Sequence, residues 1–184
     1  MENKLLEKIT TSLVGQIQKS EGLKVFAEGD NQFEQWMQVA MCAALIEGGI
    51  EYKKIRVETN VKVSYKNFSP DICFQNSEKK CAIELKVVIA EGGGARAALG
   101  KVVDDITKLE EYRKANVAEI GIILFVVYPL NNGVTMEAWA NEKGAAIRNA
   151  AYGEIINLAP QAFESKKFTF ANGKDGYIYC GVLK

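Results

Sequence analysis

The chain has 184 residues, of which 48% are hydrophobic and 25% charged, and its 23 basic and 23 acidic residues leave no net charge. These proportions are typical of a soluble globular protein, and the length suits one domain, residues 1–184, with a sizeable core. A neutral chain is not typical of an indiscriminate nucleic-acid binder, although it is compatible with a local basic groove. The absence of histidine excludes Ser-His-Asp triads, histidine-bound zinc and any reaction with a histidine base.

The expected compartment is the cytoplasm. No apolar run reaches the roughly 18 residues of a membrane span, and the first residues lack a signal-peptide pattern. The four cysteines are scattered without the spacing of a metal site, so we expect reduced thiols.

The first half of the chain predicts two helices followed by a strand. Apolar residues at helical spacing place the first helix at residues 3–20 and the second at about residues 31–47, where two glycines end it. Residues 54–66 then alternate between apolar and polar side chains, which predicts one long strand with a wet face.

A hairpin follows, made of strands at residues 70–75 and 80–89 around a short polar link, and it completes a three-stranded antiparallel meander. After a glycine-rich loop, a third helix is expected at about residues 97–114. The nearly continuous apolar run at residues 119–128 predicts a central strand covered on both faces. A helix near residues 141–151 and a second hairpin, residues 167–171 with residues 176–182, are expected in the tail.

Three side chains of the first hairpin are expected to meet. If the hairpin is centred between Ser77 and Glu78, Asp71 pairs with Glu84, and opposed residues hold their Cβ atoms about 5 Å apart. Lys86 projects on the same side as Glu84, because side chains alternate along a strand. Two carboxylates at that distance repel unless a cation lies between them. Such a set is suited to hydrolysing phosphodiesters with a divalent metal, although a plain charge pair between Glu84 and a lysine on a wet face is the alternative.

The pair Pro70-Asp71 and the triplet Glu84-Leu85-Lys86, in their strand and hairpin context, resemble the motif of the PD-(D/E)XK nuclease superfamily. The resemblance implies an α/β fold of the restriction-endonuclease type, a helix-flanked mixed sheet with the active-site hairpin in its centre. It also implies that Asp71, Glu84 and the carbonyl of Leu85 bind Mg²⁺ or Mn²⁺. Lys86 would then stabilise negative charge or position the nucleophile.

Several branches of that family carry a further acid, on the helix before the first strand, that reaches the metal. Glu34 has this location, with Glu47 and Glu58 as weaker candidates, although a glutamate also suits the first turn of a helix for electrostatic reasons.

Candidates for binding nucleic acid are Arg96 beside the glycine-rich loop, Lys101 on the third helix, and Lys62 and Lys66 on the wet face of the long strand. The alternatives are a simple mobile connection, which is favoured for the loop, and edge-strand lysines that block aggregation. On the third helix Lys101, Asp105, Lys108 and Tyr112 form one stripe, for which a solvated face with ion pairs is the favoured interpretation.

The sequence therefore predicts a Mg²⁺-dependent nuclease, in first place a DNA endonuclease, with a homodimer as the natural way to cut both strands. A non-catalytic module that binds nucleic acid or protein on the same fold is the first alternative. An RNA-cleaving nuclease of the toxin type is the second.

Overall fold

The computed structural model describes residues 2–19, 30–90, 95–131, 133–141, 153–155, 157, 164–169 and 173–183. Its helices are α1 (Glu2–Lys19), α3 (Asp30–Glu47), the 3₁₀ turn η1 (Tyr52–Lys54), α4 (Ala95–Lys114) and α5 (Met136–Ala140). Its strands are β1 (Ile55–Val57), β2 (Val61–Val63), β3 (Lys66–Phe68), β4 (Ile72–Asn76), β5 (Lys79–Ile89), β6 (Ile120–Leu130), β7 (Glu164–Thr169) and β8 (Asp175–Leu183).

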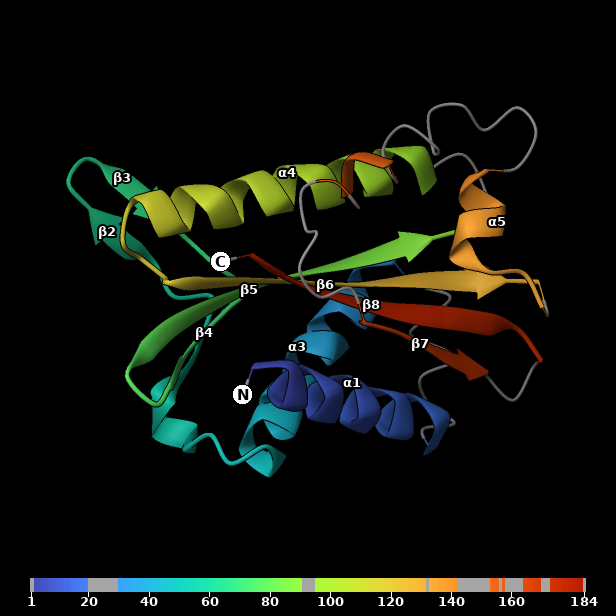
Figure 1. Cartoon of the computed structure of the whole chain (residues 1–184), viewed down its shortest axis with the longest axis horizontal. Helices are drawn as coiled ribbons and strands as arrows, with labels where there is room; N and C mark the ends of the chain where they lie inside the picture. The colour runs from blue at the N-terminus through green and yellow to red at the C-terminus, as the bar shows by residue number, and fades with distance from the viewer. Residues whose placement is uncertain are drawn as a thin grey trace.

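The fold is an α/β sandwich built on a mixed sheet. Six strands lie in the order β1-β4-β5-β6-β8-β7, and only β5 and β6 are parallel. Helix α4 makes the crossover between these two strands, as a parallel pair requires. Figure 1 shows α1 and α3 on one face of the sheet and α4 and α5 on the other.

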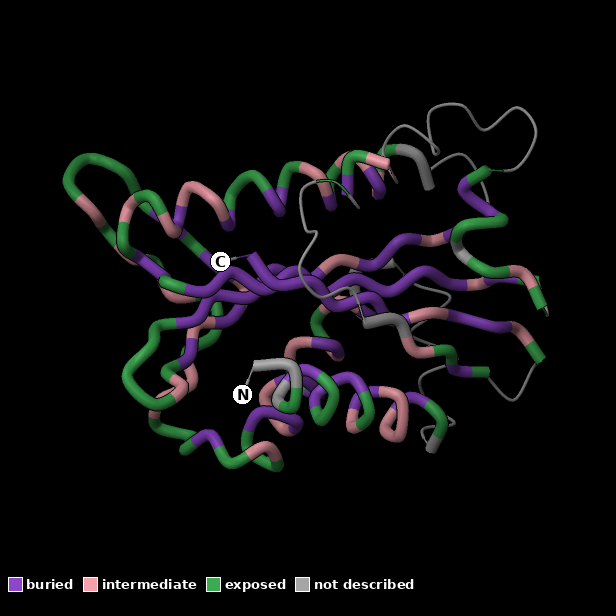
Figure 2. The backbone as a smooth tube through the Cα atoms, viewed as in Figure 1, coloured by how far each residue is buried: buried purple, intermediate pink, exposed green. Residues whose placement is uncertain are grey.

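Two hydrophobic cores therefore share one sheet. The first lies under α1 and α3 and receives Ile83, Leu85 and Val87 from β5. The second lies under α4 and receives Ala82 and Val88 from the same strand. This alternation follows from the two-residue period of a strand, and Figure 2 shows the sheet as the most deeply buried layer.

The β4–β5 hairpin is formed in the predicted register. Asn76 pairs with Lys79, so Ser77 and Glu78 make a two-residue turn, with Ser77 at a φ of 56°. A left-handed residue at this place is what a tight hairpin turn needs. The prediction that the hairpin is centred between Ser77 and Glu78 is confirmed.

The prediction of one long strand at residues 54–66 is wrong. The segment breaks at Glu58, with a φ of 45°, and again at Ser64, with a φ of 54°. Only β1 joins the main sheet, where it pairs with β4, while β2 and β3 form a separate two-stranded ribbon. The physical reason is tertiary: Phe68 and its partners in the ribbon pack into the core under α4, and Figure 1 shows the ribbon beside the end of that helix.

The remaining elements agree with the sequence within a few residues. The three helices, the buried strand β6 and the antiparallel pair β7–β8 are all present. The helix expected near residues 141–151 falls almost wholly outside the described residues, and the described helix nearby is α5. No helix within the described ranges is long and apolar enough to cross a membrane.

Candidate functional site

The site begins where β4 ends and β5 continues. Strand β4 pairs with β5 only as far as Ile72 with Ile83, whereas β5 stays paired with β6 up to Ile89. The backbone N–H of Leu85, on the side that β4 has left, donates a hydrogen bond of 2.7 Å to Asp71 Oδ2. The Asp71 carboxylate thus occupies the position of the next ladder partner at an otherwise open strand edge.

Strand alternation directs the three predicted groups to one face. Ile72 and Ile83 are cross-strand partners, and both lie in the core under α1 and α3. Their neighbours Asp71 and Glu84 are therefore directed to the opposite face, under α4, and Lys86 shares that face. The same register, continued by one residue, sets Asp71 opposite Glu84.

Glu84 is a buried acid. Glu84 is 4% exposed, and its Oε1 accepts a hydrogen bond of 2.6 Å from the hydroxyl of Tyr112 on α4. Burial and the charge of Asp71 raise the pKa of Glu84 to about 8. Burial, together with the bond to Glu84, also raises the pKa of the Tyr112 phenol. The fold therefore favours a neutral Glu84 unless a cation comes close to it.

Lys86 is held between two acids from different helices. Its Nζ lies 2.7 Å from Glu34 Oε1 on α3 and 3.9 Å from Asp105 Oδ2 on α4. Burial alone would lower the pKa of Lys86, but the hydrogen bond and charge of Glu34 and the charge of Asp105 outweigh it and raise that pKa. Lys86 therefore carries its proton at neutral pH. Within the described part of the chain its ion pairs are with these two acids, not with Glu84.

Asp105 is the most deeply buried charged group beside Lys86. It is 3% exposed, and its Oδ1 accepts a hydrogen bond of 2.5 Å from Lys108 Nζ. Its Oδ2 is buried and lacks a hydrogen-bond partner among the described residues. Burial raises the pKa of this carboxyl.

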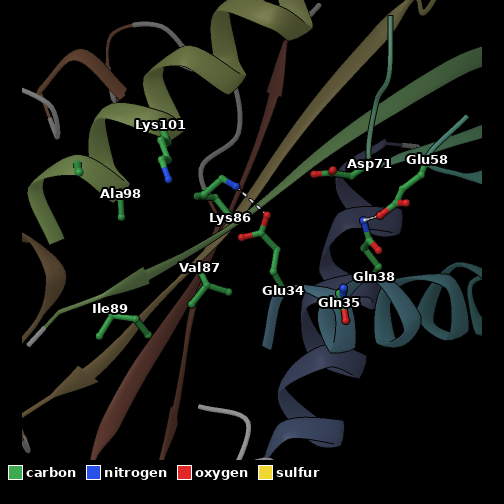
Figure 3. Close-up of a pocket in the computed structure, with 11 residues that line it drawn as sticks. Glu34, Gln35, Gln38, Glu58, Asp71, Lys86, Val87, Ile89, Ala98 and Lys101 are labelled. Carbon is green, nitrogen blue, oxygen red and sulfur yellow. Dashed lines mark hydrogen bonds and ion pairs between the residues drawn. The ribbon is translucent and has the colours of Figure 1, made fainter. Parts of the chain in front are cut away.

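A pocket of about 570 Å³ opens beside these groups, between α3 and the start of α4. Figure 3 shows Glu34 and Gln38 reaching it from α3, Lys101 from α4, and Lys86 at its centre. Glu58 also lines the pocket and accepts a hydrogen bond of 3.3 Å from Gln38 Nε2. Of the two weaker candidates for an upstream acid, Glu58 is thus at the site. Glu47 instead accepts a hydrogen bond of 2.7 Å from Ser12, outside this pocket.

The sequence missed the role of the inner face of α4. The favoured interpretation, a solvated stripe, is wrong for Asp105 and Tyr112, which are 3% and 4% exposed and contact the site. The signal was present in the sequence, because Val102, Ile106 and Leu109 repeat at the same helical spacing as these two residues and mark the buried face.

The four candidates for binding nucleic acid do not form one track. Lys101 lines the pocket, and Arg96 belongs to the first turn of α4, although its side chain is outside what the structure describes. Lys62 and Lys66 lie on the β2–β3 ribbon. Lys66 is already engaged, since its Nζ lies 2.6 Å from Glu111 Oε2. The candidates are therefore divided between the start of α4 and the β2–β3 ribbon.

The acids fit a divalent cation only in part. Within the described residues, no three Asp, Glu or Cys side chains are grouped as a ready metal site. One oxygen of each acid already accepts a hydrogen bond: Oδ2 of Asp71 from the Leu85 N–H, and Oε1 of Glu84 from the Tyr112 hydroxyl. The N–H and C=O of one strand residue lie on the same side, so the carbonyl of Leu85 is directed toward Asp71 as well. Mg²⁺ needs no more than one or two protein carboxylates, because it keeps several waters.

Comparisons of the chain with models of protein families, with curated proteins and with solved structures find no match.

Proposed function

We propose that this protein is a Mg²⁺- or Mn²⁺-dependent nuclease that hydrolyses phosphodiester bonds, with DNA as the principal substrate. The observation that carries the proposal is the hydrogen bond from the N–H of Leu85 to the Asp71 carboxylate at the point where β4 leaves β5. Asp71 there lies close enough to the buried Glu84 for its charge to raise the pKa of Glu84, and Lys86 is on the same strand face as Glu84. Such a concentration of buried acid at a strand edge is unfavourable without a cation.

The architecture supports the proposal independently of the motif. A helix, a meander of β1, β4 and β5, a crossover helix and the parallel strand β6 follow one another in this order. The restriction-endonuclease-like fold implied by the sequence has a similar core, with the active-site hairpin inside a helix-flanked mixed sheet. The β4–β5 hairpin holds the second and third places in the six-stranded sheet.

Asp71 and Glu84 would hold the cation, with the Leu85 carbonyl at the same strand edge and Glu34 as a further ligand. The cation, when bound, acidifies a water molecule and neutralises charge on the phosphate. Glu84 would bind the cation as a carboxylate, because a nearby positive charge lowers the pKa of a carboxyl.

Lys86 acts in this proposal as a charge and not as a base. Because its pKa is raised by Glu34 and Asp105, it is an ammonium at neutral pH and cannot accept a proton from water. An ammonium at this place can donate a hydrogen bond to a phosphate oxygen and stabilise the negative charge that develops there.

A second candidate function is a non-catalytic module that binds nucleic acid or protein. The lack of a ready three-acid group within the described residues and the neutral chain favour it. A module of this kind has no need for the cation, which separates the two candidates experimentally.

The test is cleavage of supercoiled plasmid, linear duplex, single-stranded DNA and tRNA with Mg²⁺, Mn²⁺ or EDTA. We expect cation-dependent cutting of DNA, and a loss of about a hundredfold or more in Asp71→Asn, Glu84→Gln and Lys86→Met, since each removes several kcal/mol of transition-state stabilisation. Asp104→Asn is the matched control, because Asp104 is an exposed acid on α4, next in the chain to the buried Asp105.

Equal activity in all of these proteins, or cleavage that persists in EDTA, would remove the proposal. Preferential cleavage of tRNA would replace DNA by RNA as the substrate.

A further inference from the structure

The Oδ2 atom of Asp105 is a buried carboxylate oxygen with no hydrogen-bond partner among the described residues. Asp105 is 3% exposed, so water cannot readily compensate for the missing partner. An unsatisfied buried acceptor of this kind destabilises the fold, and more strongly when it is charged. Native structures rarely leave such an atom without a use.

The Nζ atom of Lys86 lies 3.9 Å from this oxygen. That separation is within the range of an ion pair and outside that of a hydrogen bond. Lys86 makes its hydrogen bond in the opposite direction, to Glu34 on α3, at 2.7 Å. Two more charged residues lie around Lys86. Asp71 stands directly before β4, and Lys101 is on α4.

We propose that Asp105 is the second acceptor for Lys86 and positions it while the site is at work. When Glu34 turns to the divalent cation, the ammonium of Lys86 moves from Glu34 to Asp105 Oδ2. A displacement of about 1 Å converts the present contact into a hydrogen bond. This inference rests on the proposed function, since it needs a cation that attracts Glu34.

The movement of Lys86 from Glu34 to Asp105, here called the hand-over, keeps its ammonium group paired with an acid. Releasing Glu34 from Lys86 would otherwise leave a half-buried ammonium without a partner, which is unfavourable. Asp105 can receive the ammonium without losing its other contact, because Lys108 is bound to Oδ1 and Lys86 would bind Oδ2. Asp105 is therefore a positioning residue that acts through Lys86.

Calorimetry with Mn²⁺ tests the coupling in four proteins: the wild type, Asp105→Asn, Lys86→Met and the double variant. When Lys86 is present, we expect Asp105→Asn to weaken Mn²⁺ binding by about tenfold, which is roughly the effect of losing one charge-assisted hydrogen bond. Removing the negative charge of Asp105 also weakens cation binding by simple electrostatics, and this electrostatic effect does not require Lys86. In the Lys86→Met background we therefore expect Asp105→Asn to weaken binding by only about twofold.

An equal effect of Asp105→Asn in both backgrounds would overturn the hand-over while leaving the nuclease proposal intact. A wild type that binds no Mn²⁺ would overturn both. Lys108→Gln is the matched control: it removes the other partner of Asp105, and we expect it not to weaken Mn²⁺ binding.

A crystal structure of Glu34→Gln gives a second test that does not depend on Asp105→Asn folding well. The amide is a weaker acceptor than the carboxylate, so we expect Lys86 Nζ within about 3 Å of Asp105 Oδ2 even without metal. A Lys86 side chain that stays at position 34, or turns into the pocket, would contradict the proposal.

Discussion

Glu84 lies in an environment that disfavours its negative charge. Its neighbours on the strand are buried, Asp71 lies opposite, and the hydroxyl of Tyr112 is the donor that the structure provides for it. Of the causes that shift its pKa, burial is the largest, and the Tyr112 bond only partly counteracts it. The residue is therefore arranged to respond to a positive charge.

The pH dependence of stability follows from this environment. The folded-state pKa of Glu84 is about 8, against an ordinary value of 4.5. A carboxyl whose pKa is raised by folding stabilises the folded protein fully at pH values below its pKa in the unfolded chain. This stabilisation is lost as the pH rises to its pKa in the folded protein. In EDTA we expect the free energy of unfolding of the wild type, relative to Glu84→Gln, to fall by on the order of 2–4 kcal/mol between pH 4.5 and pH 8.

Urea denaturation at a series of pH values measures this difference. Glu78→Gln, in the exposed turn of the same hairpin, is the control and should follow the wild type at every pH. A wild type and a Glu84→Gln variant that change in parallel with pH would show that Glu84 ionises normally.

Part of the site could be predicted from residues close in the chain. The pairing of Asp71 with Glu84 needed only the centre of one turn, and Lys86 followed from strand alternation. The partner of Lys86 could not be predicted in this way, because Glu34 is 52 positions away on another element. The resemblance implies that Glu34 is a metal ligand, but its hydrogen bond to Lys86 depends on how α3 lies against β5.

At the scale of elements, the pair β7–β8 shows how closely two strands can depend on one glycine. Phe168 and Gly176 are direct cross-strand partners. A Cβ on Gly176 would lie 2.2 Å from Cζ of Phe168, a buried ring that has little room to move. The absence of a side chain at Gly176 is thus what allows the ring to pack there.

We expect Gly176→Ala to lower the free energy of unfolding by about 1–3 kcal/mol, the usual range for overpacking a core. Gly100→Ala is the matched comparison, since its Cβ would meet nothing within 4 Å on helix α4. We expect this second change to raise stability by about 0.5–1 kcal/mol. Urea midpoints measure both, and a Gly176→Ala protein as stable as the wild type would contradict the packing argument.

The elements themselves were predictable where the pattern was local. Long periodic segments gave α1, α3, α4 and β6 nearly correctly. The break of residues 54–66 was not visible, because the alternation of apolar and polar residues continues through Glu58 and Ser64 although both are left-handed. What separates β2 and β3 from the sheet is packing against α4, and a pattern along the chain carries no information about it.

At the scale of the molecule, two cores lie on opposite faces of one sheet and cannot be separated without breaking it. The chain has two tryptophans, one for each core. Trp36 packs against the core under α1 and α3, and Trp139 lies in the core under α4 and α5. Since both cores use β5, β6 and β8, they should unfold together.

Two variants that each keep one tryptophan, Trp36→Phe and Trp139→Phe, test this. We expect fluorescence in urea to give each variant a midpoint that coincides with its own far-UV circular dichroism, because the transition is cooperative. A fluorescence midpoint displaced from the dichroism midpoint in either variant would mean that one core opens first and that residues 1–184 are not a single domain.

The β2–β3 ribbon leaves the sheet after β1 and returns just before β4, and the hydrogen bond of 3.0 Å from Glu58 N to Asp71 O fastens its entrance to its exit. The excursion is therefore closed at its base, so residues can be added or removed at the tip between β2 and β3 without moving Asp71. Phe68 is the constraint on such changes, because it packs against Tyr112 in the core under α4.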